Sequence, residues 1–199
     1  YWCGYGYANI GNICEPWIVW NDVFYVICMR VQISVFQWDW KRAWINEFTG
    51  VYTMKIIEYF STDNKEYWLS KIKESDWGAG QYLHELLKNN KLKQFVGENT
   101  KVLMLVDEEN LVSFCTFADK DDIQPTELTP WIGWVYTFPN YRGNRYIGKL
   151  LSYAETLAEE AGIKNLYIST NHTGLYEKYG YEFFEMMKDM HGEDSRVYV

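Results

Sequence analysis

The clearest change of hydrophobic pattern along the chain comes in its second half, where a continuous apolar stretch is followed by a helical one. Residues 131–138 form an apolar, aromatic run, which predicts a strand. After a Pro and a polar turn, apolar residues return at the spacing of one helix face: Ile147, Leu150, Leu151, Ala154, Leu157, Ala158 and Ala161. Gly162 follows where a helix C-cap is expected. The pattern therefore predicts a strand, a tight loop and a helix that begins close to Arg145.

The chain after Met54 divides into further strands and helices by the same criteria. Helices are expected after Asp63 or Asn64 and after Gly80, a loop at 91–100, and strands at 55–60, 101–106, 111–118, 165–170, 183–187 and 196–199. A short acidic turn joins 101–106 to 111–118, which predicts an antiparallel hairpin, and Cys115 is expected to be buried in it. A right-handed crossover would place 165–170 parallel to 131–138. The predicted class is α/β, with an α+β mixed sheet.

Residues 1–53 differ from the rest of the chain. They hold six of the ten Trp, three of the four Cys and no Leu. Met54 opens a predicted strand, and residues 49–51 can be encoded by a sequence that contains a bacterial ribosome-binding site. We therefore expect 1–53 to be a translated leader of a bacterial gene, and 54–199 to be the domain. The alternative is a genuine extra hairpin with alternating Val31, Ile33 and Val35.

Composition narrows the class of protein. A chain of 199 residues with 48% hydrophobic content can form one core. The net charge of −8 argues against a nucleic-acid partner and favours an amine-bearing one. The longest apolar run, 23–29, is too short to span a membrane, and no basic region precedes it as in a secretory signal, so a cytoplasmic protein is expected. The Cys show no metal-ligand spacing, and no metal is expected.

The loop between the strand at 131–138 and the helix has the features of an anion site. The first turn of a helix leaves backbone N–H groups unpaired, and the positive end of the helix dipole lies there. Arg142 and Arg145 add full positive charges beside that turn. The loop therefore suits a phosphate or pyrophosphate. In the alternative interpretation both arginines are solvated turn residues and Gly143 only supplies a positive φ.

The stretch 131–151 resembles the acetyl-CoA-binding core of the GNAT family of N-acetyltransferases. The matching residues are Pro139, Tyr141, Arg142, Gly143, Leu150 and Leu151. Two positions depart from the family pattern, because Arg145 stands at the middle Gly and Ile147 at the Gly/Ala position. The order of predicted elements also fits, so the resemblance covers about residues 54–199. It implies the GNAT acyl-CoA N-acyltransferase fold: a central, mostly antiparallel sheet with a splayed parallel pair and flanking helices.

A second match lies in 169–183, which resembles the family's Asn…Leu-Tyr-Glu-Lys-x-Gly-Phe segment. It implies that Asn171 contacts the pantetheine arm and that Tyr176 protonates the leaving sulfur. Glu127 is the first candidate for the general base. The residues that the resemblance assigns to acetyl-CoA, the co-substrate, are Tyr136, Thr137, Arg142, Gly143, Asn144, Arg145, Tyr146, Ile147 and Asn171. The implied reaction is acetyl transfer to a primary amine of a small molecule or peptide by direct attack in a ternary complex.

Two other functions remain open at the level of sequence. One is a non-catalytic acyl-CoA sensor of the same fold. The other is a nucleotide-binding P-loop, because 143–149 reads G-x-x-x-x-G-K, but the Ser or Thr that should follow is Leu150. An acidic and aromatic rim suggests a small cationic amine as the acceptor, and its residues are Asp119, Asp121, Asp122, Glu127 and Trp131. Neither a nucleic acid nor a membrane is expected as a partner. A homodimer is compatible with the sequence but not indicated by it.

Overall fold

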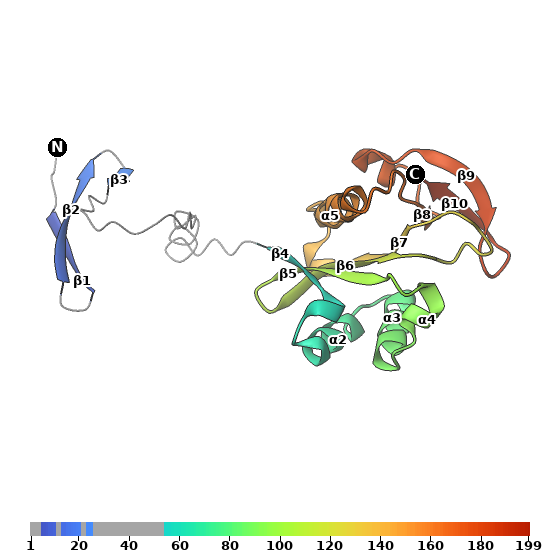
Figure 1. Ribbon diagram of the computed structural model, residues 1–199, viewed down its shortest axis with the longest axis horizontal. Coiled ribbons are helices and arrows are strands. Elements are labelled where there is room, and N and C mark those ends of the chain that lie inside the picture. Colours follow the sequence, from blue (N-terminus) through green and yellow to red (C-terminus); the bar gives the residue numbers. More distant parts are fainter. Residues whose placement is uncertain (1–4, 11–12, 21–22, 26–53) are drawn as a thin grey trace. The chain divides into compact units, whose positions relative to one another are not determined.

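The computed structural model describes residues 5–10, 13–20, 23–25 and 54–199, and the chain divides into two compact units, Tyr1–Trp44 and Ile45–Val199 (Figure 1). In the first unit three strands pair antiparallel in the order β1-β2-β3, with bounds β1 (Tyr5–Ile10), β2 (Ile13–Trp20) and β3 (Val23–Tyr25). The alternating residues Val31, Ile33 and Val35, predicted as a hairpin strand, lie outside the described residues.

The second unit is built on two sheets. A four-stranded antiparallel sheet has the order β4 (Lys55–Glu58), β5 (Lys101–Asp107), β6 (Asn110–Ala118) and β7 (Trp131–Thr137). A three-stranded sheet has the order β8 (Ile168–Thr170), β10 (Asp194–Tyr198) and β9 (Phe183–Lys188). The predicted hairpin of β5 and β6 is confirmed. The mixed sheet expected from the sequence is therefore present, in two parts.

The two sheets are linked where β7 and β8 begin. The link is a parallel bridge between Trp131 and Tyr167. It consists of hydrogen bonds from Ile132 N–H to the Tyr167 carbonyl (2.8 Å) and from Tyr167 N–H to the Pro130 carbonyl (3.0 Å). No further pairing of β7 with β8 occurs in the described residues. The predicted parallel pair thus separates as both strands run toward their carboxyl ends.

Helices cover both faces of the four-stranded sheet (Figure 1). One face is covered by α2 (Lys65–Lys73), α3 (Gly78–Lys88) and α4 (Leu92–Val96), and the other by α5 (Tyr146–Glu160). Short 3₁₀ segments are η1 (Tyr59–Ser61), η2 (Pro139–Tyr141) and η3 (Tyr176–Tyr179). None of the helices in the described residues is both long enough and apolar enough to span a bilayer.

Three predictions about the bounds of elements were wrong. The first strand ends at Glu58, because the Glu58 carboxylate accepts a hydrogen bond from Phe60 N–H (2.9 Å) and turns the chain into η1. Helix α3 begins at Gly78, before the Gly80 at which the sequence suggested its start. The predicted loop 91–100 contains α4, whose Leu92 and Val96 are buried in the core.

Strand β5 separates two hydrophobic layers. Its alternate residues Val102, Met104 and Val106 pack toward α2, α3 and α4. Leu103 and Leu105 pack toward α5, together with Leu150, Leu151, Ala154 and Ala158, all of which were predicted on the inner helix face. Cys115 is buried in the same layer, and burial raises its pKa to about 12. Each face of the sheet therefore has its own core.

The end of α5 confirms the predicted C-cap. The helix stops at Glu160, and Gly162 takes a positive φ of 72°. Ile163 N–H donates to the Ala158 carbonyl (2.8 Å), as in a helix closed by a left-handed residue. Ala161, predicted on the buried face, is exposed because it already belongs to this cap.

Candidate functional site

The candidate site lies at the carboxyl ends of β7 and β8. These strands are parallel and adjacent at Trp131 and Tyr167, so their carboxyl ends point to the same edge. The loop that leads into α5 follows β7, and the segment that contains Asn171 and Tyr176 follows β8. Crevices at the carboxyl ends of parallel strands are common ligand sites in α/β proteins. Both matched segments of the sequence thus reach one edge.

A bulge in β7 decides which side chains face each layer. Gly133 pairs with Thr116 and Tyr136 pairs with Phe114, so two residues of β7 stand opposite Cys115 alone. One of these two, Trp134, has a positive φ of 47°. The bulge reverses the in-out alternation of the strand, because Ile132 faces α5 while Trp134 faces the layer of α2, α3 and α4.

Tyr136 and Thr137 were predicted to present backbone N–H groups to a thioester, but these two N–H groups point in opposite directions. Phe138 N–H donates to the Val112 carbonyl on β6 (3.1 Å), and Ser113 Oγ donates to the Tyr136 carbonyl (2.6 Å). Backbone groups alternate along a strand, so Tyr136 N–H points toward β6 and Thr137 N–H points to the open side, toward the gap with β8. By this alternation Tyr136 N–H faces β6, whereas Thr137 N–H is directed at the gap.

The loop into α5 has the geometry of an anion cradle. Gly143 has φ 82° and Arg145 has φ 57°, so Arg145 adopts the left-handed conformation that a Gly at this position would adopt readily. The N–H groups of Arg145, Tyr146 and Ile147 make no backbone hydrogen bond within the described residues. Asn144 Nδ2 donates to the carbonyls of Tyr141 (3.1 Å) and Arg142 (3.3 Å), which holds the turn closed. The N-terminal amides of α5 therefore point out of a fixed turn.

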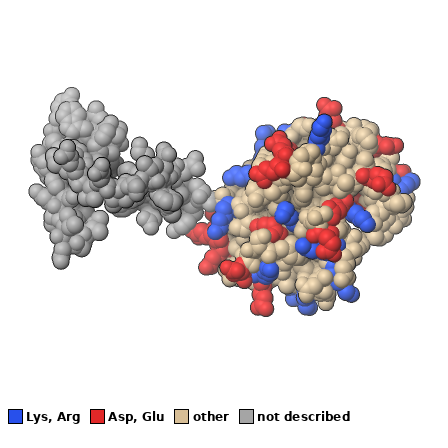
Figure 2. Space-filling view, viewed as in Figure 1, with Lys and Arg blue, Asp and Glu red and all other residues tan. Residues whose placement is uncertain are grey.

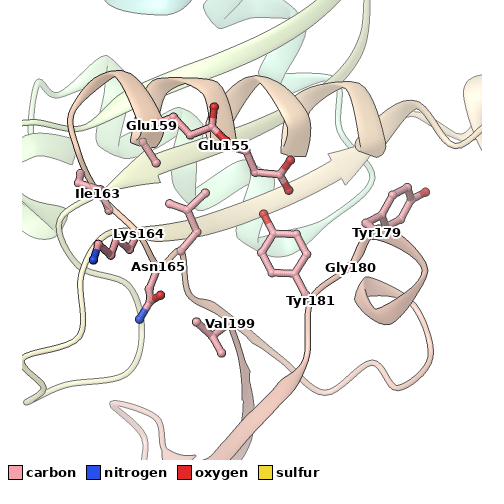
Figure 3. A pocket seen from close by; sticks show the side chains of 11 residues that line it. Glu155, Glu159, Ile163, Lys164, Asn165, Tyr179, Gly180, Tyr181 and Val199 are labelled. Carbon is pink, nitrogen blue, oxygen red and sulfur yellow. The ribbon is translucent and has the colours of Figure 1, made fainter.

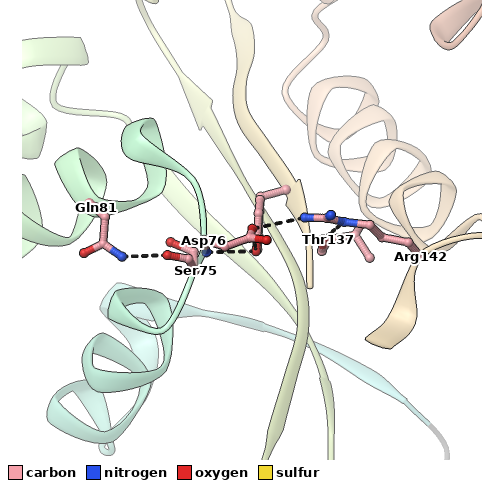
Figure 4. A network of polar contacts seen from close by, with 6 residues as sticks. Ser75, Asp76, Gln81, Thr137 and Arg142 are labelled. Atoms are coloured by element: carbon pink, nitrogen blue, oxygen red, sulfur yellow. Dashed lines mark hydrogen bonds and ion pairs between the residues drawn. The ribbon is translucent and has the colours of Figure 1, made fainter. Parts of the chain in front are cut away.

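Arg142 lies beside this cradle but is turned toward other partners. Its Nε donates to the Thr137 carbonyl (2.9 Å), and Nη2 lies 3.2 Å from Asp76 Oδ1 on the α2–α3 connection (Figure 4). The guanidinium carbon is 5.6 Å from the ring centre of Tyr136. Asp76 also accepts from the Tyr136 hydroxyl (2.5 Å). Asp76 was not among the residues predicted from the sequence, because an acidic residue between two helices has no distinguishing pattern.

Tyr176 opens η3 in the layer on the α5 side. Its ring is buried and packs at an angle against Tyr181 (6.3 Å) and Tyr198 (6.2 Å). Desolvation by burial is the largest cause that raises the pKa of Tyr176, so the hydroxyl remains protonated at neutral pH. The last residue of η3, Tyr179, packs closely on α5 at Gly148. A Cβ on Gly148 would lie 2.7 Å from a ring carbon of Tyr179.

The structure does not bring Glu127 together with the other predicted residues. Glu127 is exposed and precedes β7, whereas Thr137 ends that strand, six residues or roughly 20 Å beyond Trp131. No hydrogen bond or ion pair involving Glu127 occurs among the described residues. Its role as the general base stays a prediction. Asn171, in contrast, is exposed directly after β8, at the correct edge.

The predicted acidic and aromatic rim was also wrong in part. Trp131 is fully buried, and Asp121 is buried with its carboxylate against the backbone of Gly133. Desolvation raises the pKa of Asp121 well above its ordinary value. Asp119 accepts from Asn99 N–H (3.1 Å) and so fixes a turn. Over the face shown in Figure 2, acidic and basic side chains are intermixed.

A cavity of about 230 Å³ lies apart from this site. It is formed by the C-terminal half of α5, the chain that follows it, and the residues after η3, with Glu155, Lys164 and Tyr181 in its wall (Figure 3). None of the candidate catalytic or acetyl-CoA-binding residues lines it. Within the described residues, no group of three or more His, Cys, Asp or Glu side chains is arranged to hold a metal ion.

Comparisons with known proteins agree with the geometry. The Acetyltransferase (GNAT) family matches residues 44–181. An acetyltransferase from Streptococcus agalactiae is similar in structure, with 19% identity, a TM-score of 0.51, and coverage of 73% of this chain and 96% of that one. An acyl-CoA N-acyltransferase from Pseudomonas aeruginosa has 19% identity and a TM-score of 0.50, over 73% of this chain and 97% of that one.

An aminoglycoside 6′-N-acetyltransferase in complex with coenzyme A has 16% identity and a TM-score of 0.50, over 73% of this chain and 94% of that one. At these identities the structural likeness establishes the fold alone. Among proteins with curated functions, none matches this sequence. Because the family match extends over most of the chain, the protein belongs to the GNAT family of acetyltransferases.

Proposed function

We propose that this protein is an N-acetyltransferase that transfers an acetyl group from acetyl-CoA to a primary amine of a small molecule or peptide, by direct attack in a ternary complex. The observation that carries the proposal is the cradle at the start of α5. Its outward N–H groups and the left-handed Arg145 lie at the edge where β7 and β8 separate. If the pyrophosphate of acetyl-CoA binds there, the pantetheine arm of acetyl-CoA is directed into the gap between β7 and β8.

The same loop is unsuited to Mg-ATP. A P-loop requires a hydroxyl after its Lys to hold Mg²⁺, and that position is Leu150. The Leu150 side chain is fully buried in the layer between α5 and the sheet. Leu150 therefore offers no oxygen ligand for a metal ion on the phosphates. The anion that fits is therefore a pyrophosphate that needs no metal ion in this loop.

The proposed chemistry divides between backbone and side chain. The amine nitrogen attacks the thioester carbon, and negative charge develops on the carbonyl oxygen. Thr137 N–H, directed at the gap, can donate to that oxygen. The tetrahedral intermediate expels the CoA thiolate, which takes the phenolic proton of Tyr176. The proton that the attacking nitrogen loses passes to solvent, and solvent returns a proton to the Tyr176 oxygen. Arg142 moves to a phosphate oxygen of acetyl-CoA. The other residues that bind acetyl-CoA are Gly143, Asn144, Arg145, Tyr146, Ile147 and Asn171.

The structural comparisons support an amine acceptor of modest size. Two similar structures are an aminoglycoside 6′-N-acetyltransferase with coenzyme A and AAC(6′)-Iy with the bisubstrate analogue CoA-S-monomethyl-acetylneamine. Those ligands belong to those proteins, and they illustrate that the fold accommodates both substrates at once. We expect the acceptor here to approach from the α2–α3 side of β7, because the α5 side is filled by Tyr176 and the cradle.

An assay of CoA thiol release over a panel of primary amines tests the proposal. The purified chain and acetyl-CoA are incubated with each amine, and free thiol is measured against samples without amine. We expect release that depends on at least one amine, with mass spectrometry identifying the acetamide. Binding of acetyl-CoA without release for any amine would contradict transfer and would assign the chain to the acyl-CoA sensors.

A further inference from the structure

A positive charge already occupies a small site between the α2–α3 connection and β7. The guanidinium of Arg142 lies 3.2 Å from Asp76 Oδ1 and 5.6 Å from the centre of the Tyr136 ring. A carboxylate together with an aromatic face is the common way in which proteins recognise an ammonium or guanidinium. Arg142 therefore shows that this site accepts a cation.

The site is held in place from two directions. Gln81 Nε2 donates to the carbonyls of Ser75 and Lys73 (both 2.6 Å), which fixes the connection before Asp76 (Figure 4). Asp76 N–H in turn donates to the Tyr136 hydroxyl (3.2 Å), and that hydroxyl donates to Asp76 Oδ1 (2.5 Å). This hydrogen bond is the largest cause that lowers the pKa of Asp76, so the carboxyl is ionised at neutral pH.

The ring of Tyr136 links this site to the acetyl-transfer strand. Trp77 stacks nearly parallel on it, with ring centres 5.9 Å apart and 4° between the planes. Tyr136 packs in the layer of α2, α3 and α4, whereas Tyr176 packs in the layer of α5. A ligand seated at Asp76 would thus approach β7 from the face opposite Tyr176.

The ion pair of Arg142 with Asp76 is easily exchanged. Both side chains are more than half exposed, at 53% and 59%. Ion pairs at such exposure contribute little to stability. Arg142 also directly precedes the phosphate cradle that begins at Gly143. A pyrophosphate bound in the cradle would therefore compete with Asp76 for the same guanidinium.

We propose that Asp76 and Tyr136 form the subsite for a second, non-reacting cationic group of the acceptor, and that Arg142 leaves this subsite for the pyrophosphate when acetyl-CoA binds. The inference rests on the proposed function, and it adds the substrate class: an amine that carries another positive charge. Once Arg142 has turned away, Asp76 has no cation until the acceptor supplies one. Acetyl-CoA and a cationic acceptor therefore bind with positive cooperativity.

Linear diamines from diaminopropane to diaminoheptane test this subsite, each compared with the amino alcohol of the same length. The two members of a pair share the reacting amine and differ in the second ammonium. With acetyl-CoA saturating, the wild type should have a lower KM for at least one diamine than for its amino alcohol. In Asp76→Asn that KM should rise about 10- to 100-fold, as for loss of a charge-assisted hydrogen bond. The KM for the amino alcohol and both kcat values should stay unchanged.

Calorimetric titration with acetyl-CoA separates a positioning role from general damage to the fold. Asp76→Asn should bind acetyl-CoA as tightly as the wild type or more tightly, because Arg142 is released, whereas a damaged fold would bind it more weakly. Glu74→Gln is the matched control, since Glu74 is exposed on the same connection and pairs with Lys71 (3.1 Å). It should leave every constant unchanged.

The possible outcomes distinguish the inference from the proposed function. A wild type that acetylates primary amines without preferring any diamine, or an Asp76→Asn variant that keeps the wild-type preference for the diamine, overturns the subsite and leaves acetyl transfer intact. Weaker acetyl-CoA binding in an Asp76→Asn variant that keeps the melting temperature of the wild type overturns the exchange of Arg142. A wild type that binds no acetyl-CoA overturns the proposed function and this inference together.

Discussion

At the scale of single residues, Tyr176 carries the clearest chemical prediction. Tyr176→Phe removes one hydroxyl and keeps the ring that packs against Tyr181 and Tyr198. If the hydroxyl protonates the leaving thiolate, kcat should fall about 10²- to 10⁴-fold, with little change in the Kd for acetyl-CoA. The loss should shrink as the pH falls, because solvent then protonates the thiolate more readily. Steady-state kinetics over a range of pH, with acetyl-CoA titrations, measure both quantities.

Tyr181→Phe is the matched control for this substitution. Tyr181 is also buried, and within the described part of the chain its hydroxyl lies within the distance and angle limits of no hydrogen bond. Removing an unpaired buried hydroxyl should leave kcat unchanged and should not lower the melting temperature. An almost normal kcat for Tyr176→Phe, equal to that of the control, would exclude Tyr176 from the chemistry.

The site residues that could be predicted from the sequence belong to local sequence patterns. The features that could not be predicted depend on residues far away along the chain. Arg145 was placed at a Gly position, and the structure gives it the positive φ that this position requires. The direction of Tyr136 N–H could not be predicted, because it depends on the bulge at Trp134 and the pairing with β6. Asp76 could not be predicted either, since it meets Arg142 across 66 residues of chain.

At the scale of elements, the contact of α5 with η3 gives a second prediction. Gly→Ala inside a helix normally stabilises by about 1 kcal/mol. At Gly148 the added Cβ would lie 2.7 Å from a ring carbon of Tyr179, so the Tyr179 ring on η3 must shift away from α5. Gly148→Ala should therefore destabilise by about 1–3 kcal/mol and lower kcat, because η3 also positions Tyr176. Chemical denaturation and kinetics measure the two effects.

Gly78→Ala provides the comparison at the first position of α3, where a Cβ would meet nothing within 4 Å. It should be neutral or slightly stabilising. If Gly148→Ala behaved like Gly78→Ala in both stability and kcat, the close packing of η3 on α5 would not position Tyr176.

Elements with strong periodicity were predicted well, and elements defined by tertiary contact were not. The inner face of α5 and the β5–β6 hairpin follow from local spacing of apolar residues. Helix α4 has only five residues, and it depends on the burial of Leu92 and Val96 in a core formed by other elements. The separation of β7 from β8 was expected only from the family resemblance, since each strand alone has an ordinary apolar pattern.

At the scale of the whole molecule, the unit Ile45–Val199 contains every residue of the candidate site. We propose that residues from Met54 onward suffice for folding, because the first strand of the four-stranded sheet begins at Lys55. A truncated chain that starts at Met54 should unfold cooperatively and bind acetyl-CoA with the affinity of the full chain. Denaturation and calorimetry test this. Loss of cooperative unfolding would show that the preceding residues contribute to the core.

The central claim is that the loop from Arg142 to Ile147 binds acetyl-CoA, and thermal unfolding with two ligands tests it most directly. At a concentration of about one hundred times Kd, a ligand specific for the folded state stabilises by about 2.7 kcal/mol, which shifts the melting temperature measurably. Acetyl-CoA should raise the melting temperature, and Mg-ATP at the same concentration should not, because Leu150 replaces the hydroxyl that would hold Mg²⁺. Stabilisation by Mg-ATP with none by acetyl-CoA would contradict the assignment.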